Sequence, residues 1–195
     1  MNILFVSLGC DKNLVDTEVM LGLLASRGHQ MVDSEENADV IVINTCCFIH
    51  DAKEESIQTI LEMAEYKKAG SCKALIVTGC LAQRYKQEII DEIEEVDAVL
   101  GTTSYDKIVE AIDEALAGHT SVEMTDIDAL PLVESKRLVT TGGHFAYLKI
   151  AEGCDKHCTY CIIPKIRGNF RSVPMERLLK EAEELVSQGV KELIL

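Results

Sequence analysis

The chain has 195 residues, of which 47% are hydrophobic, enough for one large or two small domains with real cores. Its net charge of −14 argues against a broad electrostatic grip on nucleic acid by this segment. Neither a signal pattern nor an apolar run long enough to cross a bilayer is present, which predicts a cytoplasmic protein without a membrane partner. Thiols stay reduced in that compartment, so the eight cysteines indicate metal or redox chemistry rather than disulfides.

Apolar, β-rich runs alternate with segments of helical spacing along the first part of the chain. The runs predict strands at 2–8, 39–45, 73–79 and 97–101, with a weaker one at 29–33. Two of the intervening segments carry a predicted buried helical stripe: Ile57, Ile60, Leu61 and Ala64 in one, and Ile108, Ile112, Ala115 and Leu116, followed by Gly118, in the other. The alternation predicts an α/β fold, with residues 1–118 forming a doubly wound parallel sheet.

Residues 119–143 lack periodicity and are expected to form a linker. From residue 144 a second pattern begins: a strand at about 144–151, a cysteine loop, a helix whose first turn holds Pro174 and which ends at Gly189, and a strand in "VKELIL". This pattern predicts a βαβ unit within residues 144–195. Two strands and one helix bury little apolar surface, so the chain is expected to be a fragment of something longer.

Three cysteines each follow a predicted strand: Cys10, Cys46 and Cys80. The carboxyl ends of parallel strands share one edge, where ligands collect in a crevice, so these thiols are predicted to converge. Gly9 and Gly79 would let the backbone turn sharply and approach a bound group closely. The alternative is that the three are small, inert core residues, but three placements on the same edge make this the weaker interpretation.

Three further cysteines lie within "KIAEGCDKHCTYCIIP", at Cys154, Cys158 and Cys161. A structural zinc ion requires four protein ligands, and His157 is a poor fourth because it directly precedes Cys158. A four-iron cluster held by three cysteines leaves one iron with an open position, where a small molecule can bind and take an electron. The spacing therefore favours three ligands and a functional vacancy.

The run "GCDKHCTYC" resembles the cluster loop of radical S-adenosylmethionine enzymes. With the upstream triplet, the chain is identified as a member of the methylthiotransferases over essentially all of its length. It is most similar to the RimO type in "SLGCDKNLVDTE", "NTCCFIHDAKEES", "GCLAQRY" and "YLKIAEGCDKHCTYCIIPKIRGNFRS". The tRNA-modifying MiaB type usually has Gln-Met where this chain has Asp11–Lys12. The position after Cys46 is usually Gly in RimO-like chains and is Cys47 here, a thiol that could replace Cys46 as ligand.

The resemblance implies two 4Fe–4S clusters, one on Cys154, Cys158 and Cys161 and one on Cys10, Cys46 and Cys80. The first would bind S-adenosylmethionine and, given an electron donor, generate a 5′-deoxyadenosyl radical. The second would deliver sulfur, and the implied product is a methylthio group on the β-carbon of an aspartate in the ribosomal small-subunit protein S-twelve.

The resemblance also implies that residues 144–195 begin a radical-SAM (β/α) partial barrel, which in the family continues and is followed by a TRAM domain. Neither remainder is in this sequence, so the chain alone is expected to be inactive. No residue is singled out as catalytic. A tRNA adenosine methylthiotransferase and a non-enzymatic cysteine metal-binding protein stay as alternatives.

Several other residues have simpler interpretations. Cys72 is expected to be a loop thiol in a polar turn. Arg167 and Arg171 either contact S-adenosylmethionine or the protein substrate, or lie in a solvated loop. Asp16 and Glu18 are expected in the first turns of a helix, where a negative charge interacts favourably with the helix dipole.

Overall fold

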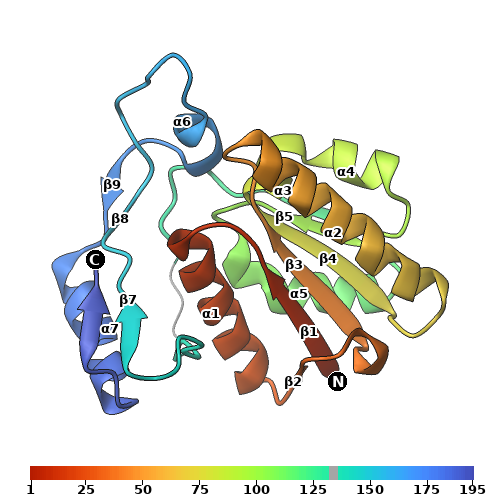
Figure 1. The fold of residues 1–195 in the computed structure, drawn as a ribbon, viewed down its shortest axis with the longest axis horizontal. Helices are drawn as coiled ribbons and strands as arrows, with labels where there is room; N and C mark the ends of the chain where they lie inside the picture. The colour runs from red at the N-terminus through yellow and green to blue at the C-terminus, as the bar shows by residue number, and fades with distance from the viewer. Residues whose placement is uncertain (132–135) are drawn as a thin grey trace.

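The computed structural model describes residues 1–131 and 136–195 (Figure 1). Its larger part, residues 2–123, is built on a six-stranded sheet in which all neighbouring strands are parallel, in the order β2-β1-β3-β4-β5-β6. The strands are β1 (Asn2–Ser7), β2 (Gln30–Val32), β3 (Val40–Thr45), β4 (Ala74–Gly79), β5 (Ala98–Leu100) and β6 (Ser121–Glu123). The strand order reverses direction between β1 and β3, which makes this the switch point where open α/β sheets bind ligands.

Helices cover both faces of this sheet because alternate strand residues point to opposite sides. Val40 and Val42 of β3 pack with α1 (Asp11–Ser26) and α5 (Ile108–Leu116). Ile41 and Ile43 pack on the other face, with α2 (His50–Lys68), α3 (Cys80–Tyr85) and α4 (Gln87–Glu92). All four side chains are fully buried, and each such burial contributes about 1.5–3 kcal/mol. Two short 3-10 helices, η1 (Glu35–Asn37) and η2 (Tyr105–Lys107), complete this part.

The predicted α/β class and parallel sheet are confirmed, but one predicted helical stripe is partly wrong. Ile60 and Ala64 of α2 are buried, whereas Ile57 and Leu61 are 37% and 46% exposed. The buried side of α2 is rotated toward Ser56 and Met63, since the helix lies across the buried strands β3 and β4.

The second part, residues 145–194, contains the predicted βαβ unit. Strand β7 (Phe145–Tyr147) pairs in parallel with β10 (Glu192–Ile194), and α7 (Met175–Ser187) packs on the pair through Leu185. The strand expected at about 144–151 is broken in two. The last hydrogen bond between β7 and β10 runs from Leu148 N to Ile194 O (2.8 Å). The chain then pairs with a different strand: β8 (Ala151–Glu152) is antiparallel to β9 (Arg171–Ser172). Helix α6 (Ile163–Arg167) lies between β8 and β9 in sequence.

The segment expected as a linker, 119–143, is not wholly a connection. Ser121–Glu123 form β6, the edge strand beside β5, and Gly101 N donates to Glu123 O (2.9 Å). Three residues are too few to show an alternating pattern, so no strand could be predicted here. Residues 132–135 of the expected linker lie outside the described residues, and the predicted domain boundaries stay predictions. No helix within 1–131 or 136–195 combines the length and apolar character needed to span a membrane.

Candidate functional site

Three cysteines follow neighbouring strands at the carboxyl edge of the six-stranded sheet. Cys10 lies between β1 and α1 and is exposed, Cys46 directly follows β3 and is buried, and Cys80 opens α3 directly after β4 and is buried. β1 and β3 flank the switch point of the sheet, and β4 is the next strand. The structure therefore places all three thiols at the predicted edge.

Two glycines allow close packing at this edge. Gly9 has φ +94°, and a Cβ on it would lie 2.7 Å from Cys46 Cβ. Gly79 has φ +91°, and its Cβ would lie 2.6 Å from Thr45 O. Both positions require glycine, for the backbone conformation and for the space. The turn that carries Cys10 is thus held directly against Cys46.

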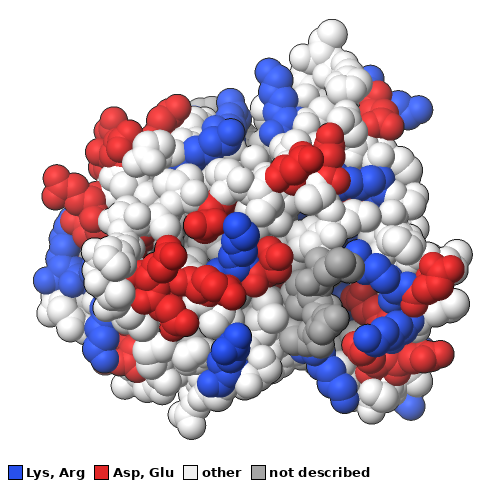
Figure 2. All heavy atoms as spheres, turned by 180° about the vertical axis from the view of Figure 1, so that it is seen from behind, with Lys and Arg blue, Asp and Glu red and all other residues white. Residues whose placement is uncertain are grey.

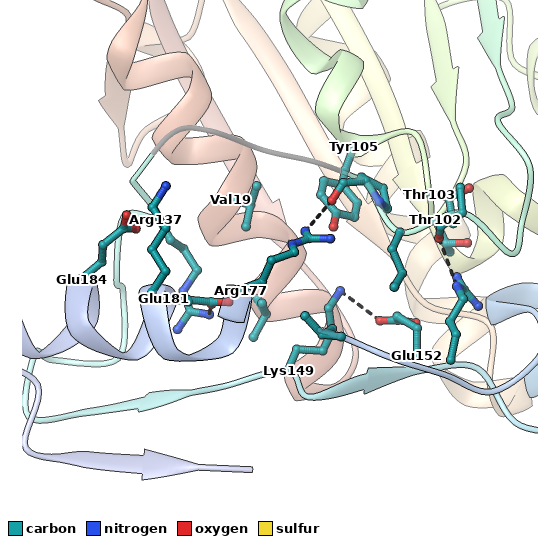
Figure 3. A pocket seen from close by; sticks show the side chains of 17 residues that line it. Val19, Thr102, Thr103, Tyr105, Arg137, Lys149, Glu152, Arg177, Glu181 and Glu184 are labelled. Atoms are coloured by element: carbon teal, nitrogen blue, oxygen red, sulfur yellow. Dashed lines mark hydrogen bonds and ion pairs between the residues drawn. The ribbon is translucent and has the colours of Figure 1, made fainter. Parts of the chain in front are cut away.

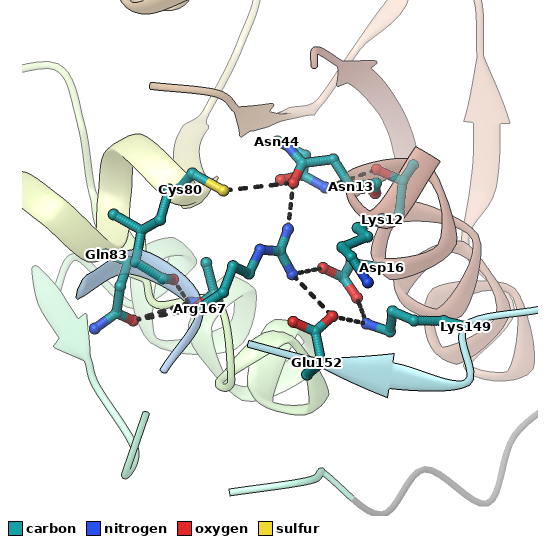
Figure 4. Close-up of polar contacts among 12 residues, drawn as sticks. Lys12, Asn13, Asp16, Asn44, Cys80, Gln83, Lys149, Glu152 and Arg167 are labelled. Atoms are coloured by element: carbon teal, nitrogen blue, oxygen red, sulfur yellow. Dashed lines mark hydrogen bonds and ion pairs between the residues drawn. The ribbon is translucent and has the colours of Figure 1, made fainter. Parts of the chain in front are cut away.

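A polar residue that the sequence did not single out, Asn13, organises the same edge. Its Nδ2 donates to Leu8 O and Thr45 O (both 2.9 Å), which uses both amide hydrogens. Its Oδ1 must therefore face the other way, where it accepts from Cys80 Sγ (3.7 Å) and from an Nη of Arg167 (Figure 4). Its position three residues after Cys10, in a helix start that also holds Asp11, Lys12 and Asp16, gave no signal that set it apart from its polar neighbours.

The neighbouring thiols differ in environment. Burial raises the pKa of Cys80 to about 11, and the positive charge and hydrogen bond of Arg167 oppose this rise. Burial also raises the pKa of Cys47, whose Sγ donates to Cys80 O (3.2 Å). Cys72 lies in the loop between α2 and β4, as expected, and it is buried there because its Sγ turns inward to donate to Ala74 O (3.1 Å).

The second triplet lies on one loop between β8 and α6. Cys154 and Cys161 are half-buried and Cys158 is exposed. The loop is closed at its base, where Cys154 N donates to Gly168 O (3.0 Å) and Phe170 N donates to Asp155 Oδ1 (2.7 Å). Within it, Cys161 N donates to Cys158 O (2.9 Å). Three accessible thiols are thus presented on a loop whose two ends are fixed.

The side chains available at both sites are thiols, the ligands that hold iron–sulfur clusters. All eight cysteines are free thiols. Within the described residues, no three His, Cys, Asp or Glu side chains lie together as ligands of a single ion. A four-iron cluster places each thiolate on a different iron and so spreads its ligands more widely. Two sets of three free thiols, one on the loop and one framed by glycine at the sheet edge, supply the kind of ligand that such clusters take.

A buried ion network joins the two parts of the chain beside the cysteines (Figure 4). Arg167 Nη1 lies 2.7 Å from Asp16 Oδ2 and 3.4 Å from Glu152 Oε1. Lys149 Nζ pairs with Asp16 and lies 2.9 Å from Glu152 Oε1. Burial alone would lower the pKa of Lys149, but the Asp16 carboxylate raises it. Two cations and two carboxylates therefore balance inside the protein.

The interpretations of Asp16 and Arg167 need correction. Asp16 is on a helix as expected, but it is 4% exposed, so it serves ion pairs to the second part rather than the helix dipole. Arg167 is also 4% exposed and does not lie in a solvated loop. Arg171 is half-buried and donates to backbone carbonyls, through Nε to Ala129 O (3.0 Å) and through Nη1 to Arg167 O (2.9 Å). Both arginines brace the structure.

A second ion cluster contacts α1 two residues after Asp16, at Glu18. Glu18 is 1% exposed, and its Oε1 accepts from Thr140 N (2.6 Å) and Thr140 Oγ1 (2.8 Å). Its Oε2 lies 3.1 Å from Arg137 Nε, an ion pair whose alignment is too poor for a hydrogen bond. Arg137 continues to Glu181 of α7 (2.6 Å) and to Tyr147 O (2.6 Å). Like Asp16, Glu18 is buried in interactions that the helix-dipole interpretation missed.

A cavity of about 290 Å³ lies between α1, η2 and α7 (Figure 3). Its wall combines apolar side chains with charges already used in the ion clusters, among them Arg137, Lys149, Glu152 and Glu181. None of the described residues that line it is a cysteine. The cavity is therefore part of the junction between the two parts and is separate from both triplets.

The Asp11–Lys12 pair also reaches the second part, because Lys12 Nζ donates to Ala151 O (2.9 Å). On the face of the molecule drawn in Figure 2, the described acidic and basic side chains are interspersed, without a continuous basic band. Together with the net charge of −14, this pattern offers little electrostatic attraction for nucleic acid on that face.

Comparison with known proteins divides the chain in the same way. Residues 2–101 match the family described as uncharacterized protein family UPF0004, and residues 148–195 match the radical SAM superfamily. The first match ends before β6 and the second begins within the βαβ unit.

Curated relatives match the chain over nearly its whole length, and each is named ribosomal protein uS12 methylthiotransferase RimO. The protein from Lachnoclostridium phytofermentans is 68% identical over 100% of this chain and 44% of its own length. Those from Desulforamulus reducens and Clostridioides difficile are 53% and 51% identical over 97% and 96% of this chain, and 43% and 42% of their own lengths. The chain thus spans less than half the length of these relatives.

Proposed function

The chain belongs to uncharacterized protein family UPF0004, and we propose that it serves in radical S-adenosylmethionine methylthiotransfer to an aspartate β-carbon of ribosomal protein uS12. One observation carries the proposal: two separate sets of three free thiols, one at the switch-point edge of a parallel sheet and one on a fixed loop of a second α/β unit. The names of the relatives support uS12 as the proposed substrate. A ribosomal substrate would place the protein in the cytoplasm, with an electron donor as a further partner.

Each triplet would hold one 4Fe–4S cluster. Cys154, Cys158 and Cys161 would leave one iron free for S-adenosylmethionine, and Cys10, Cys46 and Cys80 would hold the other cluster. When bound, these groups supply the one-electron chemistry and the sulfur for transfer. Cys47 contacts the backbone of Cys80, whereas Cys46 packs against the turn that carries Cys10, which supports Cys46 as the ligand.

The chain's own residues position these groups and exclude water. The bonds between Cys154 and Gly168 and between Asp155 and Phe170 fix the loop of the second triplet. Burial of Cys46 and Cys80 keeps solvent from two of the three thiols of the sheet-edge site, whereas Cys10 is exposed. The Arg167 network joins the two parts of the chain beside the sheet-edge cysteines.

The experiment is to measure iron and acid-labile sulfide per chain after anaerobic reconstitution. The proposal predicts roughly eight irons in the parent protein and about four in the Cys154→Ala/Cys158→Ala/Cys161→Ala variant. Only the parent should bind S-adenosylmethionine. The matched control is Cys72→Ala, which also removes a thiol and should keep the full iron content.

Zinc in place of iron, or a triple variant without iron, would refute the two-site proposal. A protein that holds iron but does not bind S-adenosylmethionine would instead be a non-enzymatic metal-binding protein. The tRNA-directed alternative has less support, since the relatives above are all named for uS12.

A further inference from the structure

Arg167 is the one charged residue among the described side chains that touches both the cysteine edge of the sheet and the second part's ion network. It ends α6, the helix that directly follows the loop of Cys154–Cys161. Its guanidinium extends into the first part, where it meets Asp16 and Asn13 of α1, 151 and 154 residues away in sequence. One side chain thus connects the loop of the second triplet to the helix that begins directly after Cys10.

The position of the guanidinium relative to Cys80 follows from Asn13. Because both Nδ2 hydrogens of Asn13 are used by backbone carbonyls, its Oδ1 is fixed as the shared acceptor of Cys80 Sγ and Arg167. A thiolate has no proton to donate, so Cys80 loses this bond when it becomes a metal ligand. Arg167 then remains the donor at Asn13 Oδ1, the atom that Cys80 Sγ also contacts, so its positive charge lies next to the Cys80 sulfur.

We propose that Arg167 is a positioning residue for the cluster site formed by Cys10, Cys46 and Cys80: its guanidinium fixes Asn13 beside Cys80 and holds a positive charge at that sulfur. The inference rests on the proposed function, because it requires a cluster at the sheet edge. Hydrogen bonds and charge near ligand sulfurs tune the reduction potential of iron–sulfur clusters. A cation at Cys80 stabilises the added negative charge of the reduced state and so raises the potential.

Because Arg167 belongs to the second part, it can act on the sheet-edge site only when the two parts of the chain are packed together. The sheet edge receives the guanidinium only when the second part is docked, since the side chain comes from α6 and is held there by Glu152. A change at Arg167 should therefore alter a property of the first cluster site although the residue lies outside that part of the chain.

The test is a redox titration of the sheet-edge cluster alone, followed by electron paramagnetic resonance, in the Cys154→Ala/Cys158→Ala/Cys161→Ala background. Into this background Arg167→Met and Arg167→Lys are introduced. The matched control is Arg137→Met, which also removes a buried arginine that joins α1 to the second part, but one whose described contacts include no cysteine or Asn13. Circular dichroism verifies that each variant is folded.

For Arg167→Met we expect the ratio of reduced to oxidised cluster at a fixed potential to fall about tenfold, which for one electron is a shift of about 59 mV to lower potential. Arg167→Lys keeps the charge and should recover part of the shift, whereas Arg137→Met should leave the potential unchanged. A folded Arg167→Met protein that holds less iron than Arg137→Met would equally support the inference. Equal potential and iron content in Arg167→Met and Arg137→Met would overturn it, while absence of iron from the background protein itself would overturn the proposed function.

Discussion

Glu18→Gln should destabilise the protein by about 3 kcal/mol although it changes a single atom. Glutamine keeps one oxygen to accept from Thr140 N and Oγ1, so those two bonds survive. What it removes is the negative charge 3.1 Å from Arg137 Nε, in a pair whose side chains are 1% and 4% exposed. Removing one partner of a buried pair costs about 3–5 kcal/mol, because the other charge stays buried and uncompensated. Arg137 retains Glu181, so the lower end of that range applies.

Urea unfolding at neutral pH measures this loss. The matched control is Glu123→Gln, which removes the same charge from a pair with Lys107 (3.0 Å) whose side chains are 42% and 33% exposed. An exposed pair contributes about 0–1 kcal/mol, so this variant should unfold at nearly the parent urea concentration. If Glu18→Gln lost less than about 1 kcal/mol, the same as Glu123→Gln, the assignment of Glu18 to a buried ion cluster joining the two parts would be refuted.

Other predictions concern the sheet edge and the titratable groups. Gly9→Ala and Gly28→Ala both place a side chain at positive φ, but only the first brings a Cβ against Cys46, so only Gly9→Ala should lower the iron content of the sheet-edge site. Burial raises the pKa of Tyr105 to about 12, so stability present below pH 10 should be lost as the pH rises from 10 through 12. Tyr105→Phe should remove that loss of stability in unfolding measurements. In a pH titration followed by tyrosinate absorbance, it should also remove the change that occurs at the highest pH. Mass spectrometry after brief thiol alkylation at neutral pH should find exposed Cys158 modified well before buried Cys72, whose pKa is raised by burial.

The sequence was sufficient for the sheet because its signal is local. Residues 39–45 and 73–79 are short, nearly continuous apolar runs, and a strand buried on both faces needs that pattern wherever it lies in the sheet. The alternation with helices then fixed the parallel arrangement, and that arrangement placed the residues after each strand at one edge. The cysteine positions followed from the fold class without knowledge of any contact.

The ion clusters could not be predicted in this way because their partners are distant. Asp16 and Arg167 are 151 residues apart, and Glu18 and Thr140 are 122 apart. A carboxylate near a helix start has a sufficient local explanation in the helix dipole, so nothing in its surroundings along the chain indicated a buried partner. The short strand β6 was missed for a related reason: its three residues gain their structure from β5 rather than from their own pattern.

The buried charges at the junction between the two parts fix its geometry more than they add to its stability. A buried ion pair is often no more stabilising than apolar side chains of the same volume, because desolvation offsets the attraction. Apolar surfaces can slide against each other, whereas an ion pair loses its energy when either partner moves. Here Arg167 of α6 holds α1 at Asp16. Arg137, which precedes the second part and is paired with Glu181 of α7, holds α1 at Glu18. Two anchors close together on one helix define its position along the axis and its rotation.

The helix they fix begins directly after Cys10, and one of the anchors comes from the helix directly after the loop of Cys154–Cys161. A reaction that depends on the distance between two metal sites would require that distance to be fixed in this way.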